Sequence, residues 1–182
     1  MKMISYEGQL IRLRPIRKSD MAVTIQWRNN PRIRENVLGY RFPVTEVMEE
    51  HWYDTMLKDP SGSWVVFAVE TLSDQELVGL VRLNQIDWIS RKCTLGVTIG
   101  EEAYHGKGLG EDSVRVMMAY AFDCLNLRKI CLEVVSYNDK ALRLYHKLGF
   151  VEEGILKNHT YLCGNYYDVV LMSAFKPSVH GE

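Results

Sequence analysis

The chain has 182 residues, of which 47% are hydrophobic and 25% charged, and its formal net charge is −1. This length suits one domain with a substantial core, so we expect residues 1–182 to form a single domain with no nucleic-acid or membrane partner. The four cysteines lack C-x-x-C or zinc-like spacing, and the chain starts without a signal peptide, so the sequence predicts no metal site and a reduced, cytoplasmic protein.

The first half of the chain is predicted to form one strand, two helices and three further strands. Residues 10–14 alternate apolar and charged side chains, which is typical of a strand. Ser19 is an N-cap candidate for a first helix that should end before Pro31, and a second helix should follow Thr45. The three strand candidates that follow are residues 64–70, residues 76–89 and an apolar run that ends at Ile99.

A glycine-rich stretch, Tyr104 to Gly110, separates this apolar run from a long amphipathic segment. Strand, glycine-rich turn and helix is the layout of a phosphate-binding site, because glycine allows close approach and the N–H groups at a helix start favour an anion. The turn lacks the ending of a Walker A loop and the glycine spacing of a dinucleotide fingerprint. A glycine-rich helix cap without a ligand is the alternative interpretation.

The second half of the chain continues with a buried strand candidate at residues 129–135. Asn138 is a suitable N-cap for the next helix, and Gly149 is a suitable end. The apolar stripe of this helix, at positions i, i+3, i+4 and i+7, consists of Ala141, Leu144, Tyr145 and Leu148. Two further strands near residues 151–156 and 166–172 complete an order that predicts a three-layer α/β/α domain of the α+β class.

These two stretches resemble the GNAT superfamily of acetyl-CoA-dependent N-acetyltransferases. One motif is the Q/R-x-x-G-x-G/A turn, here His105 to Gly110, and the other is the N-x-x-A-x-x-L-Y-x-x-x-G-F block, here Asn138 to Phe150. His105 stands where the family usually has Gln or Arg, at a position that acts mostly through its backbone. The resemblance extends to three branches, the ribosomal-protein alanine, spermidine and amino-sugar-nucleotide N-acetyltransferases.

The resemblance implies a mixed sheet of about seven strands with two splayed central parallel strands, and about four helices. It also implies acetyl-CoA as co-substrate, with the pyrophosphate on the glycine-rich turn and the pantetheine arm added along the edge of a strand. The residues expected to bind it are Val97, Thr98, Ile99, His105, Gly106, Lys107, Gly108, Leu109, Gly110, Asn138 and Tyr145.

Acetyl transfer to an amine requires two proton movements. The ammonium, with a pKa of about 10.4, must lose a proton before it attacks, and the departing thiolate needs a proton or hydrogen bond. The resemblance implies that Tyr145 is the general acid, although its place on the apolar stripe also suits a core residue. Thr94 occupies the position where ribosomal-protein transferases often carry a glutamate base. Glu133 is the remaining candidate base, with an edge position, a salt bridge or a water chain as alternatives.

Contacts to the acceptor are expected between residues 27 and 43, because binding loops lie on rigid scaffolds. The substrate candidates there are Trp27, Arg28 and Arg32, with Arg34 and Arg41 nearby, and a solvated face is the alternative. Guanidinium groups match phosphate geometry. The sequence therefore ranks an amino-sugar nucleotide first, a protein N-terminus second and a polyamine third.

The predicted function is an N-acetyltransferase that moves an acetyl group from acetyl-CoA to a primary amine by direct attack in a ternary complex, without a metal. A non-catalytic acyl-CoA-binding or sensor module on the same fold is the first alternative, and an unrelated nucleotide-binding protein is the second. The acceptor is a small-molecule amine or a protein N-terminus. A homo-oligomer is compatible with the sequence.

Overall fold

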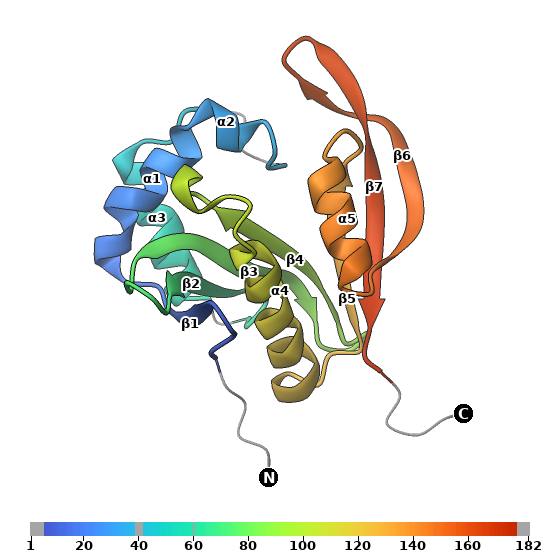
Figure 1. The fold of residues 1–182 in the computed structure, drawn as a ribbon, viewed down its shortest axis with the longest axis horizontal. Helices are drawn as coiled ribbons and strands as arrows, with labels where there is room; N and C mark the ends of the chain where they lie inside the picture. Colours follow the sequence, from blue (N-terminus) through green and yellow to red (C-terminus); the bar gives the residue numbers. More distant parts are fainter. Residues whose placement is uncertain (1–5, 39–41, 60, 178–182) are drawn as a thin grey trace.

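A computed structural model describes residues 6–38, 42–59 and 61–177, built around a seven-stranded mixed sheet (Figure 1). The strands are β1 (Ile11–Pro15), β2 (Val65–Thr71), β3 (Leu77–Asp87), β4 (Lys92–Ile99), β5 (Lys129–Val135), β6 (Val151–Leu162) and β7 (Asn165–Phe175). They lie in the order β1-β2-β3-β4-β5-β7-β6, and β4 with β5 is the parallel pair among the named strands. The predicted mixed sheet is confirmed.

The parallel pair separates soon after it forms. β4 and β5 pair over three residues, and the last register pair is Thr94 with Cys131, whereas β4 continues to Ile99 and β5 to Val135. Each strand keeps its outer partner along that length, β3 for β4 and β7 for β5. The inner edges of both strands therefore face a gap instead of each other, which confirms the predicted splay.

Helices cover both faces of the sheet and give the three predicted layers (Figure 1). On one face, α1 (Met21–Asn29), α2 (Pro31–Arg34) and α3 (Glu46–Leu57) enclose a small core that includes Trp27 and Leu80. On the other face, α4 (Leu109–Ala119) and α5 (Asp139–Lys147) cover the larger core. No helix in the described part of the chain is both long and apolar enough to cross a membrane.

The helices differ from the prediction at three places. Ser19, the predicted N-cap of the first helix, lies inside a short 3-10 helix, Lys18–Asp20, and α1 begins after Asp20. α2 is an additional four-residue helix: Pro31 occupies its first turn, and the Asn30 side chain accepts the Arg32 N–H at 3.0 Å. Pro31 thus ends the first helix, as expected, and also starts another. The helix expected to run to Leu125 changes after Ala119 into a π-helical turn, in which each N–H reaches one residue further back.

A buried carboxylate fixes the first turn of α4 against β1. Asp112 is 7% exposed, and its Oδ2 accepts the N–H groups of Leu10 at 2.7 Å and Ile11 at 3.2 Å. A Cβ atom at Gly8 would lie 2.3 Å from the same oxygen, so the chain needs glycine there to approach the carboxylate. The glycine-rich turn that precedes α4 is thereby held in place relative to the sheet.

Phe150 allows a test of the core beneath α5. It is 1% exposed and packs edge-on against Tyr145, with ring centroids 5.5 Å apart. We expect Phe150→Ala to lower the free energy of unfolding, measured by urea denaturation, by about 3–5 kcal/mol, the usual cost of emptying a buried aromatic site. Phe175→Ala is the control, because Phe175 is 48% exposed and should cost less than about 1 kcal/mol. Equal losses in the two variants would contradict this placement of Phe150.

Candidate active site

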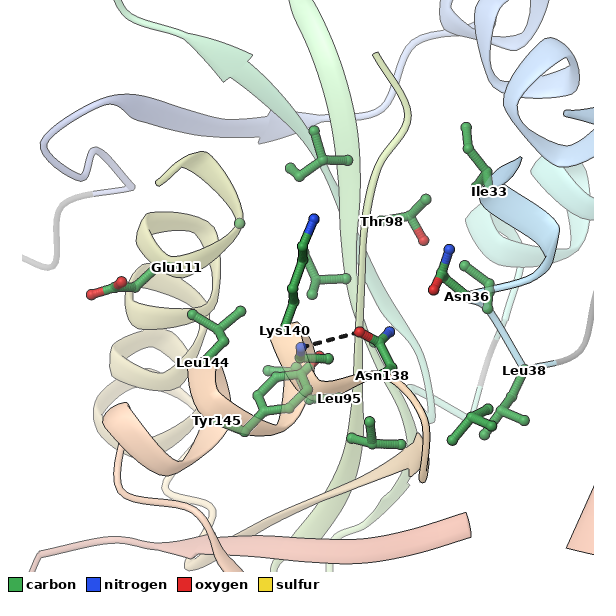
Figure 2. Close-up of a pocket in the computed structure, with 18 of the residues that line it drawn as sticks. Ile33, Asn36, Leu38, Leu95, Thr98, Glu111, Asn138, Lys140, Leu144 and Tyr145 are labelled. Atoms are coloured by element: carbon green, nitrogen blue, oxygen red, sulfur yellow. Dashed lines mark hydrogen bonds between the residues drawn. The ribbon is translucent and has the colours of Figure 1, made fainter. Parts of the chain in front are cut away.

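A cleft of about 1010 Å³ opens over the gap between β4 and β5. Figure 2 shows its two sides, with α5 on one and α2 and the segment after it on the other. The side chains labelled on these two sides include Lys140, Leu144 and Tyr145, and Ile33, Asn36 and Leu38. This volume is at the upper end of the range for small-molecule sites, so the cleft has room for a cofactor arm together with a small acceptor.

The glycine-rich turn forms one end of the cleft. Gly106 and Gly108 have φ of +74° and +85°, left-handed values that favour glycine, and α4 begins immediately afterwards. The first N–H groups of a helix lack partners within it and carry the positive end of its dipole, so this turn can hold a phosphate group. The predicted residues of the turn that line the cleft are His105, Gly106, Gly108, Leu109 and Gly110.

Lys107 of the same turn lies outside the lining, with its ammonium 5.2 Å from the centre of the Tyr104 ring. The Tyr104 hydroxyl donates a hydrogen bond of 2.6 Å to Asp74 in the β2–β3 connection. Hydrogen bonds from Thr71, Tyr104 and Ser73 lower the pKa of Asp74 to about 2. The turn is therefore tied to the sheet through an ionised carboxylate.

The His105 ring supplies a second tie. Its Nε2 lies 2.8 Å from the carbonyl oxygen of Ile99, the last residue of β4. The side chain at this position therefore connects the glycine-rich turn to the strand beside the gap. We expected this residue to act mostly through its backbone, and the ring contact adds a structural role.

The free edge of β4 forms the floor beside the turn. Val97, Thr98 and Ile99 all line the cleft, beyond the last pairing of β4 with β5. Their backbone can pair with an extended chain that carries amides. Thr98 Oγ1 is buried and has no hydrogen-bond partner among the described residues. A buried hydroxyl without a partner is costly, so this atom is a candidate contact for a ligand.

Asn138 and Tyr145 occupy the two ends of α5. The Asn138 side chain is the N-cap, and its Oδ1 accepts the Ala141 N–H at 3.1 Å (Figure 2). Tyr145 is 8% exposed and lines the cleft. Burial raises the pKa of its hydroxyl to about 12, and the charge of Arg82 opposes this shift. The hydroxyl stays protonated at neutral pH and can donate a hydrogen bond.

Glu133 lies on β5, across the gap from β4. Its neighbours Leu132 and Val134 point into the core, and alternation places the Glu133 side chain on the other face, where it is exposed and lines the cleft. None of the ion pairs found between described residues involves Glu133. Thr94 also lines the cleft, and its hydroxyl donates to Gln85 Oε1 at 3.2 Å.

Two of the three predicted acceptor residues lie away from the cleft. Trp27 is 5% exposed in the core under α1, and its Nε1 donates to Glu101 at 2.9 Å. The Arg28 guanidinium lies 3.1 Å from Glu49, a buried carboxylate on α3, and stacks over the Trp52 ring at 4.1 Å. The bond from Trp27 to Glu101 and the contacts of Arg28 with α3 occupy both side chains, so we do not retain them as substrate contacts.

Arg32 is the predicted acceptor residue that lines the cleft. It lies at the exposed rim and pairs with Glu102 at 2.7 Å. Arg34 is half-buried on α2, and Arg41 lies outside the described residues. The positive charge expected at the acceptor region therefore lies at the rim of the cleft, where the ion pair with Glu102 partly neutralises it.

Two residues of β3 that the sequence analysis did not single out lie on the cleft floor, Arg82 and Asn84. A Cβ atom at Gly96 would lie 3.1 Å from the Arg82 guanidinium, so this group rests on β4 where a side chain is missing. The Asn84 Oδ1 is buried and, among described atoms, lacks a hydrogen-bond partner. The signal was present in the sequence, because Arg82 interrupts an apolar strand as Glu133 does.

Three proteins illustrate what this chain is similar to. The spermidine N(1)-acetyltransferase of Escherichia coli K12 is 34% identical over 169 residues, which cover 91% of this chain and 86% of that protein. A putative ribosomal N-acetyltransferase of Bacillus subtilis is 32% identical over 111 residues, 61% of this chain and 60% of that protein. A crystal structure of Vibrio cholerae spermidine N-acetyltransferase with CoA and spermine is 30% identical with a TM-score of 0.83, and covers 91% and 95% of the two chains. Another structure of that Vibrio enzyme is dodecameric.

The family comparison covers most of the chain. The family model of the acetyltransferase (GNAT) domain matches residues 11–151, from β1 to the start of β6. The match includes the glycine-rich turn, both strands beside the gap, α2 and all of α5, and each of these lines the cleft. The chain therefore belongs to the GNAT family of acetyltransferases, and its activity is the acetyl-CoA-dependent N-acetylation of an amine.

Proposed function

We propose that the cleft acetylates the primary amine of a small molecule by direct attack on acetyl-CoA held in the gap between β4 and β5. One observation carries the proposal: the first turn of α4, the free edge of β4 and Tyr145 of α5 all line one cleft. The first suits a pyrophosphate, the second an amide-bearing arm, and the third a departing sulfur. Acetyl-CoA supplies the activated acetyl group, and the protein supplies placement and proton transfer.

Tyr145 is proposed to donate a hydrogen bond to the sulfur as the carbon–sulfur bond breaks. Its raised pKa keeps the proton on the phenol until negative charge develops on the sulfur. A general acid placed in this way contributes on the order of a hundredfold or more to the rate. Tyr145 packs against Phe150 and also lines the cleft, so the core and catalytic interpretations are compatible.

Glu133 is proposed to take the proton that the acceptor ammonium loses, directly or through one water molecule. The neutral amine then forms a bond to the acetyl carbon as the carbon–sulfur bond breaks, and the second proton that the nitrogen loses ends on the departing sulfur, giving the free thiol of CoA. Glu133 lines the cleft from β5, so an acceptor between it and β4 could reach the acetyl group. This placement separates the acid, on α5, from the base, on β5.

The relatives of this chain support two classes of acceptor. Similarity to spermidine acetyltransferases of Escherichia coli and Vibrio cholerae favours a polyamine, the class that the sequence ranked third. The Bacillus subtilis relative supports a protein N-terminus as a further candidate. The dodecameric Vibrio structure supports a homo-oligomer for this chain as well.

The glycine-rich turn can be tested by two glycines with matched backbone conformation. Gly108 in the turn has φ of +85°, and Gly164 at the tip of the β6–β7 hairpin has φ of +92°. Alanine at a left-handed φ costs about 1–2 kcal/mol of local strain. In Gly108→Ala this strain should displace the turn and weaken CoA binding about tenfold, as measured by calorimetry. Gly164→Ala should bind CoA as tightly as the parent. The turn would lose its assigned role if both variants kept the parent affinity.

The Tyr145 hydroxyl can be removed without emptying the core. We expect Tyr145→Phe to keep its melting temperature and CoA affinity, and to lose turnover by roughly ten- to a thousandfold. Tyr161→Phe is the control, because Tyr161 is 55% exposed on β6 and is not among the residues that line the cleft, and its turnover should not change. Parent-like turnover in Tyr145→Phe would leave Tyr145 with a packing role only. CoA binding by the parent without turnover on any amine would favour the non-catalytic acyl-CoA-binding alternative.

The base can be tested by a pH–rate profile. If Glu133 removes the proton, Glu133→Gln should flatten or displace the acidic limb of kcat/KM, because that limb reports protonation of the base. Glu46→Gln on the exposed surface of α3 provides the control and should keep the parent profile. Superimposable profiles for the parent and Glu133→Gln would exclude Glu133 and leave a water chain as the route for the proton.

A further inference from the structure

We infer that Arg82 makes the acceptor side of the cleft an anion-recognition site, so that the acceptor is a primary amine that also carries a phosphate or carboxylate group. This inference rests on the proposed N-acetyltransferase function and specifies its acceptor class. It opposes the polyamine that similarity favours, and it depends on a residue different from those that the sequence suggested.

The position of the Arg82 guanidinium is set by β4. Arg82 on β3 is the register partner of Gly96, and a Cβ atom at Gly96 would lie 3.1 Å from Cζ, Nε and Nη2 of Arg82. The guanidinium therefore rests on the β4 backbone at the residue that has no side chain. β3 and the gap lie on opposite sides of β4. By resting on the β4 backbone, the Arg82 guanidinium therefore brings its positive charge toward the gap. Arg82 and Tyr145 line the same cleft, and the Arg82 charge opposes the rise that burial causes in the pKa of Tyr145.

The Arg82 charge has no partner among the described residues. Across residues 6–38, 42–59 and 61–177, no carboxylate forms an ion pair with it and no acceptor takes a hydrogen bond from it. A guanidinium has five N–H donors, and partly buried charges are normally paired. Arg14 follows this rule with Asp20 at 2.8 Å, and Arg28 follows it with Glu49. Arg82 is thus an available cation on the floor of a cleft.

Two buried polar atoms share the face of Arg82. The β3–β4 register pairs Leu80 with Thr98 and Asn84 with Thr94, so Arg82, Asn84 and Thr98 all point to the same side of the sheet. Asn84 Oδ1 and Thr98 Oγ1 both lack hydrogen-bond partners among the described residues. A ligand with an anionic group and hydrogen-bond donors would pair with all three, whereas an apolar ligand would leave them unsatisfied.

The carboxylates that line the cleft are Glu111, Glu133 and Asp139. Glu111 already pairs with Arg115 and Lys147, each at 2.8 Å, Glu133 is assigned to proton removal, and Asp139 lies in the first turn of α5. The cationic side chains that line the cleft are Arg32, Arg82, Lys140 and Arg143. A polyamine would bring its remaining positive charges toward Arg82, whereas an anionic group would neutralise it.

The test uses amines that differ in one charged group. The pairs are ethanolamine with phosphoethanolamine, glucosamine with glucosamine 6-phosphate, and butylamine with 4-aminobutyrate, and spermidine is the polyamine. For the parent we expect at least one anionic member to exceed its neutral partner in kcat/KM by about ten- to a hundredfold, the usual effect of a charge-assisted hydrogen bond. The phosphate and carboxylate pairs identify which anion is recognised.

Variants of Arg82 separate recognition from structure and from chemistry. Arg82→Gln should abolish the preference for the anionic member, and Arg82→Glu should reverse it and raise kcat/KM for spermidine. Lys92→Gln is the control, because Lys92 is an exposed cation on β4 outside the cleft lining, and it should retain the parent preference. Melting temperature and CoA affinity should stay at the parent values in all three variants.

Several outcomes would overturn the inference. These are spermidine as the best substrate of the parent, an anionic preference that survives in Arg82→Gln, or an equal loss for all amines, which would assign Arg82 to the reaction. Calorimetry with glucosamine 6-phosphate and 4-aminobutyrate on the CoA complex distinguishes failure of the anion site from failure of the proposed N-acetyltransferase function. If no amine is acetylated but one of these ligands binds the parent and not Arg82→Gln, the proposed function fails and the anion site stands. If neither acetylation nor binding occurs, both fail.

Discussion

The early end of the pairing between β4 and β5 is the constraint on which the rest of the site depends. The two strands pair only as far as Thr94 and Cys131, and each then continues with its outer partner alone. If β4 and β5 paired along their whole length, the backbone N–H and C=O groups on their inner edges would bond to each other and the gap would close. Because the strands separate, these groups have no neighbouring strand, and an extended amide-bearing ligand can supply the missing hydrogen bonds.

Residues inside the cleft are held by contacts outside it. Asp112 fixes the first turn of α4 against β1, so the helix start that receives an anion cannot shift relative to the sheet. Phe150 packs behind Tyr145, which lines the cleft, and pairing with β7 holds Glu133 in place on β5. The missing side chain of Gly96 lets Arg82 reach across β4. A catalytic arrangement needs such support, because small displacements of reacting groups are costly in rate.

The sequence predicted the parts of the fold and site that depend on local patterns. Glycine spacing and helix periodicity located the turn before α4 and the position of Tyr145, and the family resemblance added the splay. The contacts of Trp27 and Arg28 could not be predicted, because they join α1 to Glu101 and to Glu49, and such pairings over long sequence separations leave no periodic signal. Arg82 left the same signal as Glu133, a charge in an apolar strand, but its importance depends on Gly96 in the neighbouring strand.

A crystal structure of the protein with bound CoA would test the central claim most directly. We expect the pyrophosphate to contact N–H groups of Gly106 to Gly110, the pantetheine arm to pair with β4 beyond Thr94, and the sulfur to lie within about 3.5 Å of the Tyr145 hydroxyl oxygen, the range of hydrogen bonds to sulfur. CoA bound along another surface, or in the gap with its sulfur directed away from Tyr145, would contradict the mechanism proposed for this cleft.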